Sequence, residues 1–124
     1  MIKISIIIPV HNRKKVTIKG LTSLNSALEN YYKKSKLIVY DIVLVDDGST
    51  DNTSDWVSKH YPNTDIIYGD GNLWWSGAIN LGVNYSLNNL NPNYIMFWND
   101  DLIIEPEYFR RLEEIVINEK FKNS

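Results

Sequence analysis

The chain has 124 residues, a formal net charge of −2 and no cysteine. That length suits one domain with a substantial core, and the nearly balanced charge gives no electrostatic basis for binding nucleic acid. Without cysteine the chain forms no disulfide bond and no thiolate metal site, which is consistent with a reducing compartment. The apolar N-terminal run stops at Pro9. It is therefore too short for a transmembrane helix, and it lacks the layout of a signal peptide.

Apolar segments predict four strands separated by helices. The β-branched run Ile4–Ile8 predicts the first strand, which should end at Pro9 because proline cannot donate to a strand ladder. Apolar residues at helical spacing then predict a helix over residues 13–32. Three further strands are expected at residues 37–45, 65–68 and 94–98.

Capping and breaking residues indicate where the other helices begin and end. A residue within 49–51 should cap the second helix, which ends before Pro62, and Ser76 is a suitable cap for the third. Pro106, flanked by two glutamates, marks the start of the fourth. This alternation predicts βαβ crossovers and an α/β fold of Rossmann-like type, with an open, mostly parallel sheet and helices on both faces.

Polar residues follow three of the four predicted strands, at positions 11–13, 46–49 and 99–101. Because the carboxyl ends of parallel strands share one edge of the sheet, we expect these residues to form one site. Asp100 and Asp101 are costly side by side unless a positive charge lies near them. A divalent ion such as Mg²⁺ takes one or two carboxylates together with substrate phosphates. The alternative is a plain polar turn in which Asp101 caps the next helix.

Two further features suit a ligand site. The carboxylate of Asp47 can accept the N–H of a pyrimidine ring or a ribose hydroxyl proton, or else it caps a turn. The glycine-rich loop at residues 69–77 lets the backbone approach a ligand closely, and its Trp74 and Trp75 either contact a base or sugar or belong to the core. No Ser-His-Asp arrangement, dinucleotide-binding glycine motif or nucleoside triphosphatase loop is present.

Segments 6–12, 42–51 and 99–101 together resemble family 2 glycosyltransferases, and the box at residues 72–82 resembles their rhamnosyltransferase-like branch. The resemblance covers residues 1 to about 110. It implies a nucleotide-binding fold termed GT-A and the transfer of a sugar from a UDP- or dTDP-sugar donor to a glycan or lipid-linked acceptor. It also implies assistance by Mg²⁺ or Mn²⁺ and, as is usual in the family, inversion at the anomeric carbon.

The same resemblance assigns roles to single residues. Asp101 would bind the metal, Asp100 would touch the ribose or the surroundings of the metal, and Asp47 would take the ring N–H of the base. Trp74 stands where this branch often has glycine. The resemblance also places Pro9, His11 and Asn12 by the base and ribose, and Gly77 and Asn80 near the donor diphosphate and sugar. Arg13, Gly48 and Trp75 complete the set of donor-binding residues that we expect.

Members of the family continue into an acceptor-binding half that carries the catalytic base, and nothing in residues 1–124 corresponds to it. We therefore expect a truncated domain with a donor site and no catalytic residue, and an exposed apolar surface where a second half would pack. Homodimerisation through that surface stays open. We expect a role in polysaccharide biosynthesis in the cytoplasm, with the inner face of the membrane as a further option. The alternatives are a related nucleotidyltransferase and a non-catalytic module that binds nucleotide sugars.

Overall fold

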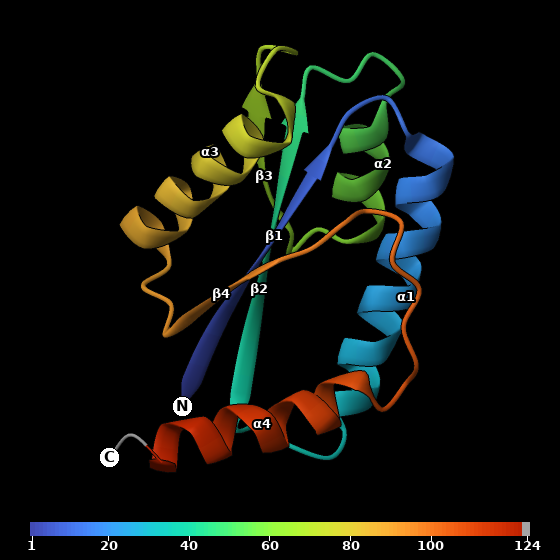
Figure 1. Ribbon diagram of the computed structural model, residues 1–124. Helices are drawn as coiled ribbons and strands as arrows, with labels where there is room; N and C mark the ends of the chain where they lie inside the picture. The colour runs from blue at the N-terminus through green and yellow to red at the C-terminus, as the bar shows by residue number, and fades with distance from the viewer. Residues whose placement is uncertain (123–124) are drawn as a thin grey trace.

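Four parallel strands in the order β3-β2-β1-β4 form an open sheet in the computed structural model, which describes residues 1–122 (Figure 1). The strands are β1 (Ile2–Val10), β2 (Ile38–Asp47), β3 (Asp65–Gly69) and β4 (Tyr94–Phe97). The chain runs outward from β1 through β2 to β3 and then returns to β4 on the other side of β1. The strand order therefore reverses at β1, where α/β sheets bind their ligands.

Helices cover both faces of this sheet, as predicted (Figure 1). They are α1 (Lys14–Tyr32), α2 (Thr53–His60), α3 (Trp74–Asn89) and α4 (Tyr108–Lys122). Ile6 and Ile8 of β1 pack with α1, α2 and α4, whereas Ile7 packs with Ala78 of α3. A strand buried on both faces needs the continuous apolar run that the sequence shows here. In Figure 1, α4 crosses the end of the sheet at which β1 begins.

The first strand is longer than predicted, because it continues through Pro9 to Val10. Ile7 accepts a hydrogen bond from Trp98 on the β4 side, at 2.9 Å. Residues two apart in a strand face the same neighbour, so Pro9 also faces the β4 side. β4 ends at Phe97, opposite Ile7. An N–H at position 9 would therefore have no partner in β4, and proline costs the ladder no hydrogen bond there. The proline is tolerated for that reason.

The start of α3 also differs from the prediction, because the helix begins at Trp74 and not after a Ser76 cap. Its first turn is set by Leu73, whose carbonyl oxygen accepts a hydrogen bond from Gly77 N at 3.0 Å. Leu73 packs into the cluster beneath α3. This anchoring by tertiary contacts outweighs the local preference of the serine.

The outer edge of β4 is unpaired among the described strands. Tyr94 and Phe97 on this strand, and Ile103 beyond it, are exposed. These side chains agree with the expected exposed apolar surface, while homodimerisation stays a prediction. Within residues 1–122, no helix combines the length and apolar character that crossing a membrane requires.

Candidate functional site

A cavity of about 480 Å³ lies at the carboxyl edge of the sheet, where the tips of β1, β2 and β4 meet. It is lined by Pro9, Val10, His11, Arg13, Asp47, Gly71, Trp74, Trp75, Ala78, Asn99, Asp100 and Asp101. Residues from all three polar tips therefore line one cavity, as expected. A second cavity of about 600 Å³ lies between α1, β2 and the segment at residues 60–64, and none of the predicted site residues lines it.

The acidic pair beyond β4 is held by side chains of the first helix and the residue before it. Thr17 donates a hydrogen bond to Asp100 Oδ2 at 3.0 Å, and Arg13 Nη1 lies 3.2 Å from Asp100 Oδ1. Arg13 Nη2 also lies 3.7 Å from Asp101 Oδ2. Burial raises the pKa of the Asp100 carboxyl above its ordinary value, while the Thr17 hydrogen bond and Arg13 oppose that rise. Arg13 is thus the counter-charge that the adjacent carboxylates require.

The two carboxylates differ in their access to a metal. The Asp100 side chain is 5% exposed and both of its oxygens already have partners, whereas the Asp101 side chain is 53% exposed. Within residues 1–122, no group of three or more His, Cys, Asp or Glu side chains is placed to hold a metal ion. Asp101 nevertheless fits Mg²⁺ or Mn²⁺, since a hard ion can take one carboxylate and complete its shell with substrate phosphates and water.

At the end of β2, Asp47 organises the loop that precedes α3. Its Oδ1 accepts a hydrogen bond from Gly71 N at 2.8 Å, and its Oδ2 accepts one from Leu73 N at 3.1 Å. Asp47 is buried but lines the cavity. An ionised carboxylate has about four acceptor positions, and these two bonds use two of them. The predicted contact of Asp47 with a nucleobase stays a prediction, and its bonds to the loop are a second role that the sequence did not reveal.

The tip of β1 is tied to the loop after β2. His11 Nδ1 hydrogen-bonds the carbonyl oxygen of Asp47 at 2.5 Å. Because a carbonyl only accepts, Nδ1 donates in this bond, and the other ring nitrogen, Nε2, lies 3.5 Å from Asn12 Nδ2. Asn12 accepts a hydrogen bond from Thr50 N at 2.7 Å. The Asn12 side chain therefore braces two loops and does not line the cavity.

Seven of the eleven predicted site residues line the cavity: Pro9, His11, Arg13, Asp47, Trp75, Asp100 and Asp101. Asn12, Gly48, Gly77 and Asn80 do not line it. Gly48 instead lies close to Gly71. A Cβ added at Gly48 would be 2.7 Å from the Cα of Gly71. Gly77 faces the Leu73 side chain, and Asn80 is exposed one turn further along α3.

Five lining residues were not among those eleven: Val10, Gly71, Trp74, Ala78 and Asn99. Gly71 and Trp74 lie in the loop whose glycine and tryptophan content was the available signal. Two residues behind the site had no local signal. Thr17 bonds Asp100, and Gly20 lets α1 contact the backbone carbonyl of Asp100, because a Cβ at Gly20 would overlap that oxygen.

An open parallel sheet with an acidic and polar cavity at its switch point is an α/β fold of the Rossmann-like type predicted. The sequence profile described as glycosyl transferase family 2 matches residues 5–122. The chain therefore belongs to the family 2 glycosyltransferases.

Two curated relatives agree with this assignment. The chain is 33% identical over 118 residues to "Glycosyltransferase GlyA" of Streptococcus pneumoniae, a match that covers 93% of this chain and 15% of the relative. It is 35% identical over 90 residues to "Low-salt glycan biosynthesis hexosyltransferase Agl10" of Haloferax volcanii, covering 71% of this chain and 28% of the relative. The chain thus spans less than a third of the length of these relatives.

Solved structures agree on the fold. The structure of Staphylococcus aureus TarS residues 1–349 in complex with UDP matches with a TM-score of 0.71 at 22% identity, covering 94% of this chain and 32% of that chain. A longer TarS structure matches with a TM-score of 0.68 at 23% identity, and the match covers 94% of this chain and 20% of the TarS chain. The predicted GT-A type of fold is confirmed.

Proposed function

We propose that this chain is the donor-binding part of a glycosyltransferase that moves a sugar from a nucleotide diphosphate sugar to an acceptor. The observation that carries the proposal is that Arg13, Asp101 and Asp47 line the same cavity, with Arg13 and Asp101 at the β4 end and Asp47 at the β2 end. Family membership supports the reaction class. The UDP bound by TarS supports a pyrimidine nucleoside diphosphate as the ligand.

Each end of the cavity suits one part of such a donor. Asp101 binds Mg²⁺ or Mn²⁺, which when bound offsets the charge of the diphosphate and stabilises it as a leaving group. Arg13 faces the same phosphate oxygens, to which a guanidinium can donate two hydrogen bonds. Asp47 accepts the ring N–H of the base, and His11 lies beside the ribose.

The finer parts of the proposal rest on the family resemblance. These are the rhamnosyltransferase-like branch, inversion at the anomeric carbon, and a glycan or lipid-linked acceptor. We propose a cytoplasmic site of action in polysaccharide synthesis.

Calorimetry with UDP and dTDP, each with and without Mn²⁺, tests the proposal. We expect binding that depends on the metal, and an affinity about tenfold or more lower in Asp101→Ala, by analogy with the loss of other metal-site groups. Asp55→Ala removes an exposed carboxylate of α2 outside the cavity and should bind like the wild type. If the wild type binds neither nucleotide, the proposal is wrong. Unchanged affinity in Asp101→Ala would instead favour a binding module that needs no metal.

A further inference from the structure

The backbone at Trp74 departs from a rule that the other described residues keep. Six described residues have a positive φ, and five of them are of types that tolerate the left-handed conformation: Asn12, Asn52, Asn91, Gly48 and Gly71. The sixth is Trp74, with a φ of 57°. A bulky side chain is strained in that region, and such strain gathers at functional sites.

The fold gains little from the indole of Trp74. This residue is 80% exposed, and none of the aromatic contacts among the described side chains, residues 1–119, involves it. Its neighbour Trp75 differs, because it packs edge-to-face against Phe97 with the ring centroids 6.1 Å apart. Packing therefore accounts for a tryptophan at position 75 but not for a strained one at position 74.

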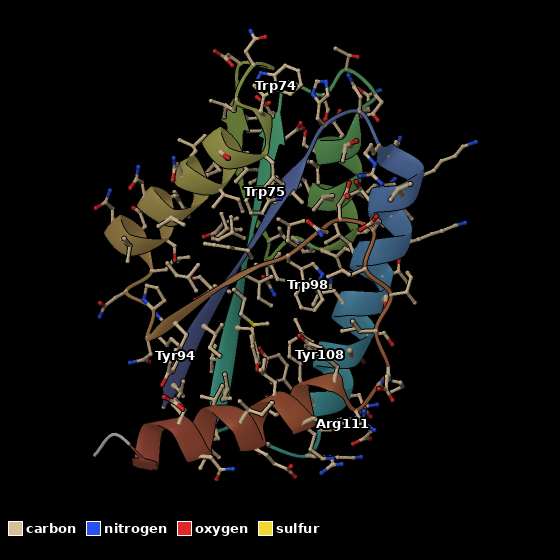
Figure 2. The ribbon with its side chains drawn as sticks, in the orientation of Figure 1. Trp74, Trp75, Tyr94, Trp98, Tyr108 and Arg111 are labelled. Carbon is tan, nitrogen blue, oxygen red and sulfur yellow. The ribbon has the colours of Figure 1, made fainter. Side chains whose placement is uncertain are left out.

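Hydrogen bonds and packing of the preceding residue, Leu73, fix the position of Trp74. The N–H of Leu73 is fixed by the Asp47 carboxylate at 3.1 Å, and its carbonyl oxygen by Gly77 N at 3.0 Å. The Leu73 side chain packs beneath α3. Strain persists where the surroundings determine the conformation in this way. The result is an indole on the wall of the cavity, at the start of α3 (Figure 2).

Arg13, the one lysine or arginine among the lining residues, lies at the opposite end of the cavity from Trp74. Arg13 and Asp101 lie at the β4 end, whereas Trp74 adjoins the loop that Asp47 holds at the β2 end. These ends are two strand spacings apart, or roughly 10 Å. A nucleoside diphosphate carries its charge at one end and an uncharged flat ring at the other. The β4 end suits the diphosphate, so the ring belongs beside Trp74.

We infer that Trp74 stacks on the base of the bound nucleotide, an inference that rests on the proposed donor site. An exposed aromatic ring stacks on any base, because every base has a π face. The ligand thus supplies the packing that the fold does not give to this side chain. On this view the strained backbone is retained for binding and not for stability.

Trp74→Asn tests the inference, because asparagine accepts the left-handed conformation but offers no ring. We expect its Tm to rise by about 2–5 °C and its affinity for UMP, UDP and dTDP to fall about 5- to 100-fold. Trp74→Phe keeps a ring and the strain, so its Tm and affinity should stay near those of the wild type. Tyr68→Asn removes an exposed aromatic residue outside the cavity and should leave the affinity unchanged.

Three results would overturn the inference. The first is unchanged UDP and UMP affinity in Trp74→Asn, which leaves the proposed donor site intact. The second is a Trp74→Asn variant that loses affinity for a UDP-sugar but keeps its affinity for UDP and UMP, which would assign the indole to the sugar. The third is a lower Tm for Trp74→Asn, which would show that the tryptophan stabilises the fold. If the wild type binds no pyrimidine nucleotide, the proposed function fails and the inference fails with it.

Discussion

Arg13 forms an ion pair with Asp100 across the carboxyl edge of the sheet, with Nη1 and Oδ1 3.2 Å apart. The same guanidinium reaches Asp101, with Nη2 3.7 Å from Oδ2. Two adjacent carboxylates thus share one cation that the chain itself supplies. A divalent ion that approaches Asp101 has to compete with that cation, since both are attracted to the same oxygens.

Replacing Arg13 should change the affinities for Mn²⁺ and for UDP in opposite directions. We expect Arg13→Gln to bind Mn²⁺ alone about 2- to 5-fold more tightly, because the carboxylates lose a competing ion pair of modest strength. The same variant should bind UDP more weakly in the presence of Mn²⁺, because the diphosphate loses a cationic partner. Calorimetry and the electron paramagnetic resonance signal of free Mn²⁺ measure the two affinities. Lys15→Gln removes an exposed charge outside the cavity and is the matched control. Equal Mn²⁺ affinity in all three proteins would contradict the competition.

A substitution at Gly20 of α1 tests how closely this helix must pack against the backbone of Asp100. A glycine-to-alanine change inside a helix ordinarily stabilises by about 1 kcal/mol, but here the new Cβ would overlap the Asp100 carbonyl oxygen. We expect Gly20→Ala to lower the free energy of unfolding by about 1–3 kcal/mol and to weaken Mn²⁺-dependent UDP binding. Urea unfolding and calorimetry measure the two effects. The exposed Ser26→Ala change on the same helix should stay within about 0.5 kcal/mol of the wild type. A more stable Gly20→Ala would show that the helix can move away without cost.

Asp47 should matter for stability as well as for binding. Its carboxylate accepts two backbone hydrogen bonds, from Gly71 and Leu73, and an asparagine amide can accept only on its oxygen. One N–H would be left facing a donor, so we expect Asp47→Asn to lower the free energy of unfolding by about 1–3 kcal/mol. Chemical unfolding at pH 7 measures this change. Asp70→Asn, in the same loop but exposed and outside the cavity, is the control. Stability equal to the wild type would mean that the loop does not depend on these two bonds.

The sequence predicts the strands well because a buried parallel strand needs a continuous apolar run, whatever its neighbours are. It predicts the meeting of the three tips because parallel strands end at one edge of the sheet. The ends of elements depend on tertiary contacts instead. Pro9 remains in β1 because β4 is short, and Ser76 does not cap α3 because Leu73 is anchored one residue before the helix.

The roles of polar residues were harder to predict than their location. Asn12 occupies a strand tip, yet its side chain bonds Thr50, a partner that only the folded structure brings near. Thr17 and Gly20 support Asp100 from a helix about 80 residues earlier in the chain. A hydroxyl and a glycine inside a helix carry no local sign of such a contact.

The attachment of α4 should make the chain sensitive to acid in a defined range. Glu107 lies 3.1 Å from Lys34 Nζ of the segment after α1 and 2.6 Å from Arg110 Nε. Hydrogen bonds from Arg110 and Lys34 lower the pKa of Glu107 from its ordinary value of 4.5 to about 2. A carboxyl whose pKa is depressed in the folded state stabilises that state above its unfolded pKa and stops doing so as the pH falls through its folded pKa.

The contribution of Glu107 should therefore be present above about pH 4.5 and disappear as the pH falls toward about 2. We expect Glu107→Gln to be less stable than the wild type at pH 6 and equally stable near pH 2. Urea unfolding at several pH values measures the difference, which should also shrink in high salt because these charges are exposed to solvent. Glu29→Gln, an exposed change on α1 without an ion pair among those described, should show no such pH dependence. A difference between Glu107→Gln and the wild type that stays constant from pH 6 to pH 2 would mean that Glu107 acts through packing and not through its charge.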